Sequence, residues 1–406
     1  MQQREHDLVL VGATGFVGRL TAAHLARHAP PEVRVALAGR SRDKLERVRT
    51  KLPDPGREWP LVVLDVTDVE AVAALARSTG VVVSTVGPYA VHGLPLVQAC
   101  AAEGTHYADL TGEVLFVRRS IETAHDEAAR TGARIVHSCG FDSVPSDLAL
   151  LLATEAAAAD DEGRPVDATL HVRRTKGGFS GGTVDSMRQQ MIALQGDREA
   201  RRVVADPDAL AAGRTTYGRG LPPVGRDRRT GRWYGPFLMA GYNTRLVRRS
   251  WSLTHGSEPL VYDEVMDTGR GRRGRLAALA LTGGLAGLAA AMSRSPTRAL
   301  VDRLLPAPGE GPSQERRSAG MFVMQTHVRT TTGARYVVTV AAPYDPGYDG
   351  TAVMLGQAGL ALVAGDRASE RGGVLTPATA LGEALVDRLT QHGFTLEVAR
   401  EGGGTP

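Results

Sequence analysis

Short apolar runs alternate with helix-length segments along the first 150 residues of the chain. The runs expected to be buried strands are Leu8–Val11, Val33–Ala38, Leu61–Leu64, Val81–Thr85, Ile135–His137 and a shorter one at His106–Ala108. Helices are expected between them at Val17–Arg27, Val69–Arg77, Pro95–Ala102 and Arg119–Arg130. Because apolar strands that alternate with helices are typical of a doubly wound parallel sheet, we predict an α/β domain over residues 1–150.

The pattern changes after residue 150. Strands are expected at Ala168–Thr175, Phe322–Thr330, Arg335–Ala342 and Thr395–Val398, and helices at Thr183–Leu194, Leu238–Arg249, Leu276–Met292, Gly350–Val363 and Pro377–Gln391. Segments 217–236 and 306–318 are rich in Gly, Pro and Arg and are expected to be surface loops. We predict a second, α+β domain over 151–398 with a mainly antiparallel sheet, helices of 350–392 that pack back on the first domain, and a disordered tail at 399–406.

Composition narrows the classes of function. The formal net charge of the 406 residues is only +4, which gives no reason to expect a nucleic-acid partner. The two cysteines, Cys100 and Cys139, are too few for a disulfide framework or a cysteine metal site, so no metal is expected. The N-terminus runs into a strand without a basic and apolar leader, so we expect a cytoplasmic protein. The sequence leaves a homo-oligomer open.

The turn after the first strand carries a glycine pattern, in the stretch GATGFVG. A strand, a glycine turn and a helix aim backbone N–H groups at an anion, so this turn is typical of a dinucleotide site. Gly15 leaves room for a pyrophosphate, and Gly18 lets the helix pack close to the strand. The residues expected to hold the cofactor here are Gly12, Ala13, Thr14, Gly15, Phe16, Val17 and Gly18. A tight turn without a ligand is the alternative.

The end of the second strand distinguishes NAD from NADP. NAD sites place an acidic residue there to hold the ribose hydroxyl, whereas this chain has Gly39, Arg40 and Ser41. Arginine matches phosphate geometry, and Ser41 is also suited to cap the next helix. We therefore predict NADP as the cofactor, with NAD as the alternative.

Two further strand ends are expected to complete the cofactor crevice, because ligands bind at the carboxyl ends of parallel strands. Asp65 and Val66 follow the third strand, where Asp65 is suited either to an adenine amine or to a helix cap before Val69. The fourth strand is followed by Ser84, Val86, Gly87, Pro88 and Tyr89, which are expected near the nicotinamide ribose. Tyr89 is the first candidate for contact with the reacting ring, with packing on the sheet edge as the alternative.

Several motifs together resemble the saccharopine dehydrogenase-like oxidoreductases. They are GATGFVG, VSTVGPY, HYADLTGE, CGFDSVPSDL, GGTVDSM and GGVLTPATALGEALVDRL, and they extend from about residue 7 to about residue 398. The most similar branch is the trans-acting enoyl reductases of actinobacteria. The resemblance implies a Rossmann domain, an α/β substrate domain, a nicotinamide cofactor and reduction of double bonds on polyketide-synthase-bound lipid chains.

Enoyl reduction needs a proton donor beside the hydride acceptor. No tyrosine is followed four residues later by lysine, so the short-chain reductase arrangement is absent, and no zinc-binding or acyl-serine motif occurs. The catalytic candidates are Tyr89, Asp142 and Tyr107, with His106, Asp109 and Cys139 also at strand ends. None is preferred, and a mechanism that uses a water or backbone N–H groups stays open. In CGFDSVPSDL, Ser143 or Ser146 is also expected to cap the following helix.

A second glycine-rich stretch, TKGGFSGGTVDSM, precedes an expected helix. Lys176, Gly181, Gly182 and Thr183 form a candidate site for an anion such as a carboxylate, a thioester oxygen or a pantetheine phosphate. The alternative is a flexible loop with a glycine-rich cap.

Residues 276–292 are uncharged and lie between arginine clusters. A buried helix or hairpin, a peripheral lipid contact and a membrane span all stay open. We expect an NADPH-dependent reductase of a carbon–carbon double bond in a lipid or polyketide acyl chain, with the substrate on a carrier protein in one version of this hypothesis. The alternatives are a C–N oxidoreductase and a lipid-associated adaptor without turnover.

Overall fold

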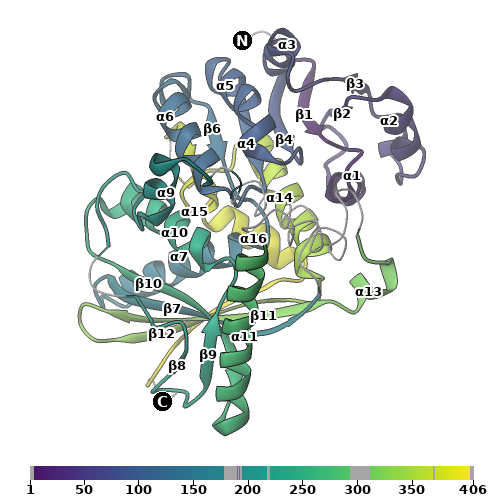
Figure 1. Cartoon of the computed structure of the whole chain (residues 1–406). Coiled ribbons are helices and arrows are strands. Elements are labelled where there is room, and N and C mark those ends of the chain that lie inside the picture. The colour runs from purple at the N-terminus through teal and green to yellow at the C-terminus, as the bar shows by residue number, and fades with distance from the viewer. Residues whose placement is uncertain are drawn as a thin grey trace.

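The computed structural model describes residues 4–177, 190, 192, 194–216, 220–292, 311–368 and 371–402. Two seven-stranded sheets dominate these residues (Figure 1). Sheet A has the strand order β13-β6-β5-β4-β1-β2-β3 and is parallel throughout. Its strands are β1 (His6–Val11), β2 (Val35–Gly39), β3 (Leu61–Val63), β4 (Thr79–Ser84), β5 (His106–Asp109), β6 (Arg134–Val136) and β13 (Gly373–Leu375).

Helices cover both faces of sheet A, as the sequence pattern predicts. On one face α5 packs against both α3 and α6, and on the other face α1 packs against α14, which also contacts β4 and β5. The helices that follow strands β1 to β6 are α1 (Phe16–His28), α2 (Arg42–Arg49), α3 (Val69–Ser78), α4 (Tyr89–His92), α5 (Leu94–Ala102), α6 (Val114–Thr131) and α7 (Val144–Ala159), with a short 3-10 turn η1 (Gly56–Glu58). The prediction of a doubly wound α/β sheet is confirmed.

Sheet B is mixed and mostly antiparallel, in the order β14-β12-β11-β7-β10-β9-β8. Its strands are β7 (Pro165–Lys176), β8 (Gly225–Arg226), β9 (Trp233–Pro236), β10 (Val261–Gly269), β11 (Met321–Thr330), β12 (Arg335–Ala342) and β14 (Thr395–Arg400). Only the pair β7 and β10 is parallel among these described strands. Alternating burial along β11 and β12 shows that one face of sheet B is buried and that the other is mostly half-buried.

A layer of helices joins the two sheets, as Figure 1 shows. It includes α7 and α10 (Ala240–His255), which pack on sheet B and on each other, and α14 (Thr351–Ala364), α15 (Pro377–Ala380) and α16 (Glu383–Gln391). The remaining elements are α9 (Arg198–Ala205), α11 (Gly271–Met292), α13 (Gln314–Ser318) and the π-helical turn η2 (Pro346–Gly350). The predicted boundary at residue 150 falls inside the continuous helix α7.

Several sequence expectations differ from the structure, including the loop expected at 306–318, in which Gln314–Ser318 form helix α13. Segment 217–236 is not all loop, because β8 and β9 form a hairpin within it, and β10 and β13 were not foreseen. The single helix expected at Pro377–Gln391 is two helices, separated at Leu381 and Gly382, where Gly382 has a φ of +55°. Strand β14 runs to Arg400, past the expected start of a tail. The helix expected at Thr183–Leu194 lies almost entirely outside the described residues.

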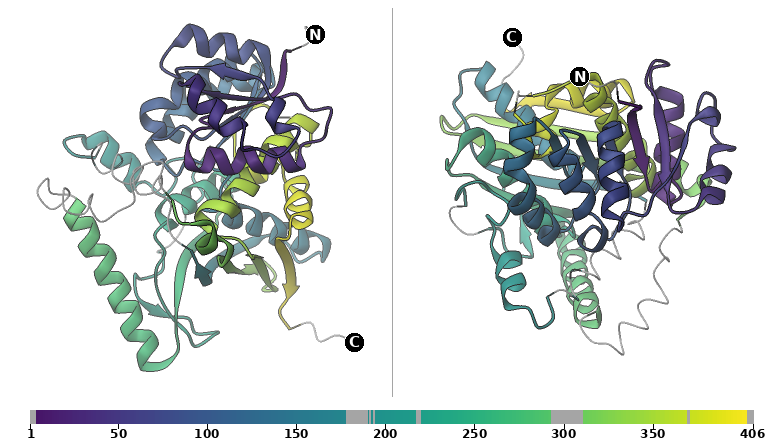
Figure 2. Two further views of the ribbon diagram at one scale, coloured as in Figure 1. Left: turned by 90° about the vertical axis from the view of Figure 1, so that its right-hand side faces the viewer. Right: turned by 90° about the horizontal axis from the view of Figure 1, so that it is seen from above.

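The apolar segment forms one long helix, α11, that is mostly unburied, which excludes the buried helix or hairpin among the three alternatives that the sequence leaves open. Figure 2 shows α11 standing out from the body of the molecule. Leu276 is 66% exposed and Leu279 is 49% exposed. The helix packs on β9 and β10 along one side only, where Ala278 is buried.

Candidate active site and cofactor crevice

The glycine turn after β1 has the close backbone packing that a dinucleotide site needs. Gly12 has a φ of +85°, and a side chain on Gly18 would place its Cβ 2.2 Å from the carbonyl oxygen of Gly12. Helix α1 begins at Phe16, so its first N–H groups point out of the turn without helical acceptors. These features confirm the packing role of Gly18 and leave the turn open to a pyrophosphate.

The end of β2 presents a cation where NAD sites have a carboxylate. Arg40 is exposed, and the Ser41 hydroxyl accepts the Lys44 N–H at 3.4 Å, which confirms Ser41 as the cap of α2. Asp65 is not a helix cap, because that role belongs to Asp68. Asp65 instead accepts the N–H and hydroxyl of Thr67, and these bonds lower the pKa of its carboxyl.

The segment after β4 is fixed to β1 and β5 by side chains. Thr85 donates its hydroxyl to the Gly12 carbonyl at 3.0 Å. The Glu113 carboxylate accepts the N–H groups of Tyr89 at 3.0 Å and Ala90 at 2.7 Å, and so caps α4. The Tyr89 hydroxyl donates to the Ser84 carbonyl at 3.0 Å. This arrangement fixes the loop 84–89 at the carboxyl edge of sheet A, where the sequence predicts the cofactor crevice.

Tyr89 and Tyr107 remain predictions as catalytic residues, but the structure buries both. Tyr89 is 4% exposed and Tyr107 is fully buried on β5, and burial raises the pKa of each hydroxyl well above its ordinary value. Neither hydroxyl faces solvent as it lies. Asp142 sits half-buried in the turn before α7, at the same edge of sheet A.

A buried chain of three side chains has the connectivity of a hydrolase triad. Asp109 Oδ2 lies 2.8 Å from His137 Nδ1, and His137 Nε2 lies 2.8 Å from Ser120 Oγ. All three side chains are fully buried, so no substrate reaches Ser120. The chain is structural, because it ties the ends of β5 and β6 to α6.

The motif CGFDSVPSDL links the two sheets. Ser143 occupies the N-cap position of α7, but its hydroxyl does not cap the helix and donates instead to Asn243 Oδ1 at 3.0 Å, so the capping expectation is wrong for this residue. Asn243 Nδ2 donates to Glu264 at 2.9 Å and lies 3.4 Å from the Ser146 hydroxyl. Asp147 accepts the Ala378 N–H at 2.8 Å.

Burial raises the pKa values of the carboxyl groups at this junction between the sheets. It raises the pKa of Glu264 to about 7 and that of Asp147 to about 6, although their hydrogen bonds act in the opposite direction. Cys139 is fully buried, and burial raises the pKa of its thiol. Burial, with nearby Arg134 and Arg4, lowers the pKa of His106 to about 4. None of these shifts gives an exposed acid at the crevice.

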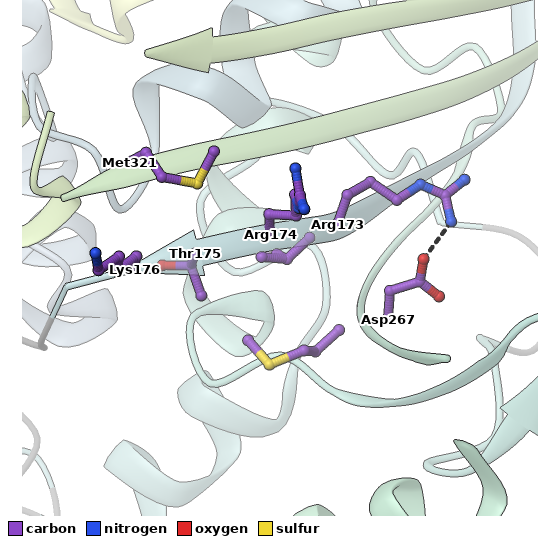
Figure 3. A pocket seen from close by; sticks show the side chains of 8 residues that line it. Arg173, Arg174, Thr175, Lys176, Asp267 and Met321 are labelled. Carbon is purple, nitrogen blue, oxygen red and sulfur yellow. Dashed lines mark hydrogen bonds and ion pairs between the residues drawn. The ribbon is translucent and has the colours of Figure 1, made fainter. Parts of the chain in front are cut away.

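Sheet B contributes a pocket of about 600 Å³ at the end of β7 (Figure 3). Val172, Met266 and Met321 give it an apolar wall, and Arg174, Thr175 and Lys176 add polar groups. The Arg173 guanidinium is paired with Asp267, as the dashed line in Figure 3 indicates. Among the residues that the structure describes, Arg174 and Lys176 are therefore the two cations of this pocket without a carboxylate partner. Lys176 is the described part of the predicted anion site. Gly181, Gly182 and Thr183 lie outside the described residues.

Contacts connect this end of β7 with the glycine turn. A Cβ on Gly177 would lie 2.4 Å from Asp345 Oδ2, and Asp345 is the cap of η2. In η2, the Tyr348 ring meets the Phe16 ring edge-on, with 4.9 Å between the centroids. The residue after β7 and the first residue of α1 thus approach the same segment, η2 and its cap.

Two site residues were missed by sequence reasoning. Arg317 of α13 lies over the Phe16 ring at 5.3 Å and pairs with Asp349 at 3.1 Å, and nothing in the sequence marks it. Tyr242 of α10 shares a short hydrogen bond with the Ser138 hydroxyl, and burial raises the pKa of Tyr242 above its ordinary value.

Comparison with known proteins defines the class. Residues 8–136 match the family model of the saccharopine dehydrogenase NADP binding domain. The residues fit NADP, because the turn at Gly18 excludes a side chain and the end of β2 has no carboxylate. The protein is therefore a saccharopine dehydrogenase-like, NADP-dependent oxidoreductase.

Full-length relatives define the branch. A trans-acting enoyl reductase of Mycobacterium ulcerans is 44% identical over 416 residues, which cover 98% of this chain and 99% of that protein. A trans-acting enoyl reductase of Mycobacterium tuberculosis is 43% identical over 419 residues, with the same two coverages. This chain belongs to the trans-acting enoyl reductase family.

Solved structures confirm the fold. Saccharopine dehydrogenase (L-Glu forming) from Saccharomyces cerevisiae aligns over 97% of this chain and 99% of its own, with a TM-score of 0.55 at 13% identity. Homospermidine synthase from Legionella pneumophila, in complex with NAD, covers all of this chain and 95% of its own, with a TM-score of 0.50 at 9% identity. At these identities the likeness concerns the fold alone.

Proposed function

We propose that the protein is an NADPH-dependent enoyl reductase that acts in trans on a lipid or polyketide acyl chain. The observation that carries this proposal is the 43–44% identity over nearly the whole chain to proteins named trans-acting enoyl reductases. Their names support a substrate that is held by a separate protein.

The pocket of sheet B supports this substrate class. Val172, Met266 and Met321 offer an apolar and adaptable lining for an acyl chain. Arg174 and Lys176 are exposed and suited to the phosphate of a pantetheine arm.

In the proposed reaction, hydride from bound NADPH adds to the β-carbon of the unsaturated thioester and a proton adds to the α-carbon. This chain holds the cofactor through the glycine turn and the end of β2. Glu113 and Tyr89 fix the loop 84–89, which we predict to lie beside the nicotinamide ribose.

The alternative of a C–N oxidoreductase has less support in the pocket. A substrate with several carboxylates needs several cations that are available to bind it. Arg173 is already paired with Asp267, which leaves Arg174 and Lys176 in the described lining.

A substrate panel separates these functions. Oxidation of NADPH is followed at fixed enzyme concentration with a trans-2-decenoyl thioester, and separately with glutamate plus an amino-aldehyde. We expect turnover with the thioester alone. Turnover only in the C–N reaction would contradict the proposal, as would an enzyme that binds NADPH but reduces neither substrate.

The proposed contact between Lys176 and the pantetheine phosphate is tested with two thioesters. They are decenoyl-phosphopantetheine and decenoyl-N-acetylcysteamine, and the second lacks the phosphate. We expect Lys176→Ala to raise KM about tenfold for the first probe and less than twofold for the second. Arg164→Ala is the control, because Arg164 pairs with Glu258 outside the pocket. Equal effects of Lys176→Ala on both probes would exclude a phosphate contact.

A further inference from the structure

Helix α11 exposes an apolar surface that the proposed reaction does not use. It is 22 residues long, and an 18-residue window within its span Gly271–Ala291 has a mean hydropathy of 1.4, with only 11% of that window buried. Among the described helices it alone is long and apolar enough to cross a membrane. The side chain of Leu276 is 66% exposed, and that of Leu279 is 49% exposed.

This helix is poorly suited to water. Surface helices normally confine apolar residues to one stripe, but residues 276–292 include no charged side chain on any face. Gly283, Gly284 and Gly287 lie in its interior, where a Cβ would have nothing within 4 Å, and glycine is less favourable than alanine inside an exposed helix. An apolar medium that offers no competing hydrogen bonds removes both problems.

The arginines at the N-terminal end of α11 indicate which apolar medium the helix contacts. Arg270, Arg272, Arg273 and Arg275 are all exposed at its N-terminal end. The Arg275 guanidinium lies 5.6 Å from the centre of the Trp233 ring, and tryptophan is enriched at membrane interfaces. A cluster of arginines beside an all-round apolar helix matches anionic headgroups above acyl chains.

The packing of α11 decides between lying on a bilayer and crossing it. Residues 276–292 extend about 25 Å at 1.5 Å per residue, which is less than the ~30 Å hydrocarbon core. One side of the helix is held against the protein, because a Cβ on Gly235 of β9 would lie 3.0 Å from Leu281. A helix fixed to a folded sheet in this way is not free to span.

We propose that α11 is an interfacial anchor that docks the enzyme on an anionic lipid bilayer. The exposed leucines enter the acyl region and the four arginines meet the headgroups. Helix α11 packs on β10, and β10 supplies Met266 to the pocket of sheet B, so docking places that pocket beside the bilayer. This inference stands without the proposed reaction.

Flotation of the full-length protein with vesicles tests it. Phosphatidylcholine vesicles with 30% phosphatidylglycerol are compared with phosphatidylcholine alone. We expect flotation with the anionic vesicles and at least tenfold weaker partitioning for Leu276→Glu combined with Leu279→Glu. We also expect Arg272→Glu combined with Arg273→Glu to weaken binding about tenfold to anionic vesicles and less than twofold to neutral ones.

A matched control makes the comparison strict. Val69 on α3 is 68% exposed, close to the 66% of Leu276, so Val69→Glu adds the same charge at an equally exposed apolar site. Val69→Glu should float like the unmodified protein, and Leu276→Glu alone should not. Melting temperature and NADPH affinity, measured without lipid, report that each variant is folded.

Three results would overturn the proposal. One is no flotation with either vesicle, and another is an equal loss in Val69→Glu and Leu276→Glu. The third is evidence that a protein, and not lipid, covers the apolar surface of α11. That partner is a second copy if sedimentation without lipid gives a dimer that the leucine variants dissociate, or a carrier protein if they lose only carrier binding.

Discussion

The cofactor turn on sheet A is made of backbone, whereas the pocket on sheet B is made of side chains. At Gly18 the nearest atom to an added Cβ is a backbone carbonyl oxygen at 2.2 Å, and the residues involved lie within a few positions of one another. The pocket combines β7, β10 and β11, which are distant in the sequence. The cofactor half therefore tolerates almost no change at its glycines, while the substrate half can vary with the substrate.

The largest expected effect is at the cofactor turn. Gly18→Ala pushes α1 away from the Gly12 carbonyl, and we expect NADPH affinity to fall more than 100-fold in a fluorescence titration. Gly241→Ala in α10 is the control, since nothing lies within 4 Å of a Cβ built there. If Gly18→Ala binds NADPH with an affinity within twofold of the unmodified protein, close backbone packing at Gly18 is not required for cofactor binding.

The next effect concerns the junction between the sheets. Burial raises the pKa of Glu264 from 4.5 to about 7, so the fold favours the protonated carboxyl. Its contribution to stability is complete below about pH 4.5 and is lost as the pH rises through 7, by on the order of 3 kcal/mol. Glu264→Gln should flatten this fall in the free energy of unfolding, measured in urea from pH 5 to 8. Parallel pH curves for the two proteins would contradict it.

A smaller effect is expected at the end of β2. Arg40→Asp should weaken NADPH binding by about 10- to 100-fold and leave NADH binding nearly unchanged, because a carboxylate repels the 2′-phosphate. Arg47→Asp, exposed on α2, provides the same charge change without the contact. An equal loss for both cofactors in Arg40→Asp would show that Arg40 does not select NADP.

The smallest effect separates structure from catalysis at Tyr89. Its hydroxyl bonds to the Ser84 carbonyl, so we expect Tyr89→Phe to cost about 1 kcal/mol of stability and to change kcat less than tenfold. Thermal melting and steady-state kinetics provide the two readouts. A kcat loss above 100-fold with unchanged melting would instead make Tyr89 the proton donor.

Sequence reasoning succeeded where local rules decide structure. Buried strands, the glycine turn and the Ser41 cap depend on residues within a few positions of each other, and these features were predicted. Sequence reasoning failed where distant contacts decide. Strand β13 joins sheet A beside β6, and Gly373–Leu375 is too short to show a period.

The site follows the same division. The sequence did not reveal that Tyr89 turns its hydroxyl to Ser84, or that Ser143 bonds to Asn243 of α10 rather than capping α7. Arg317 reaches Phe16 from 301 positions away in the sequence. Helix α11 was ambiguous because a buried helix and a lipid-facing helix share one composition, and only its packing separates them.

Label transfer tests the central claim most directly. NADPH carrying deuterium at the transferable C4 position is incubated with the enzyme and a trans-2-decenoyl thioester, and the product is analysed by mass spectrometry and NMR. The account predicts a saturated thioester with one deuterium at the β-carbon, and no such product with Gly18→Ala. A product that lacks β-deuterium, or oxidation of NADPH without saturation of the double bond, would contradict it.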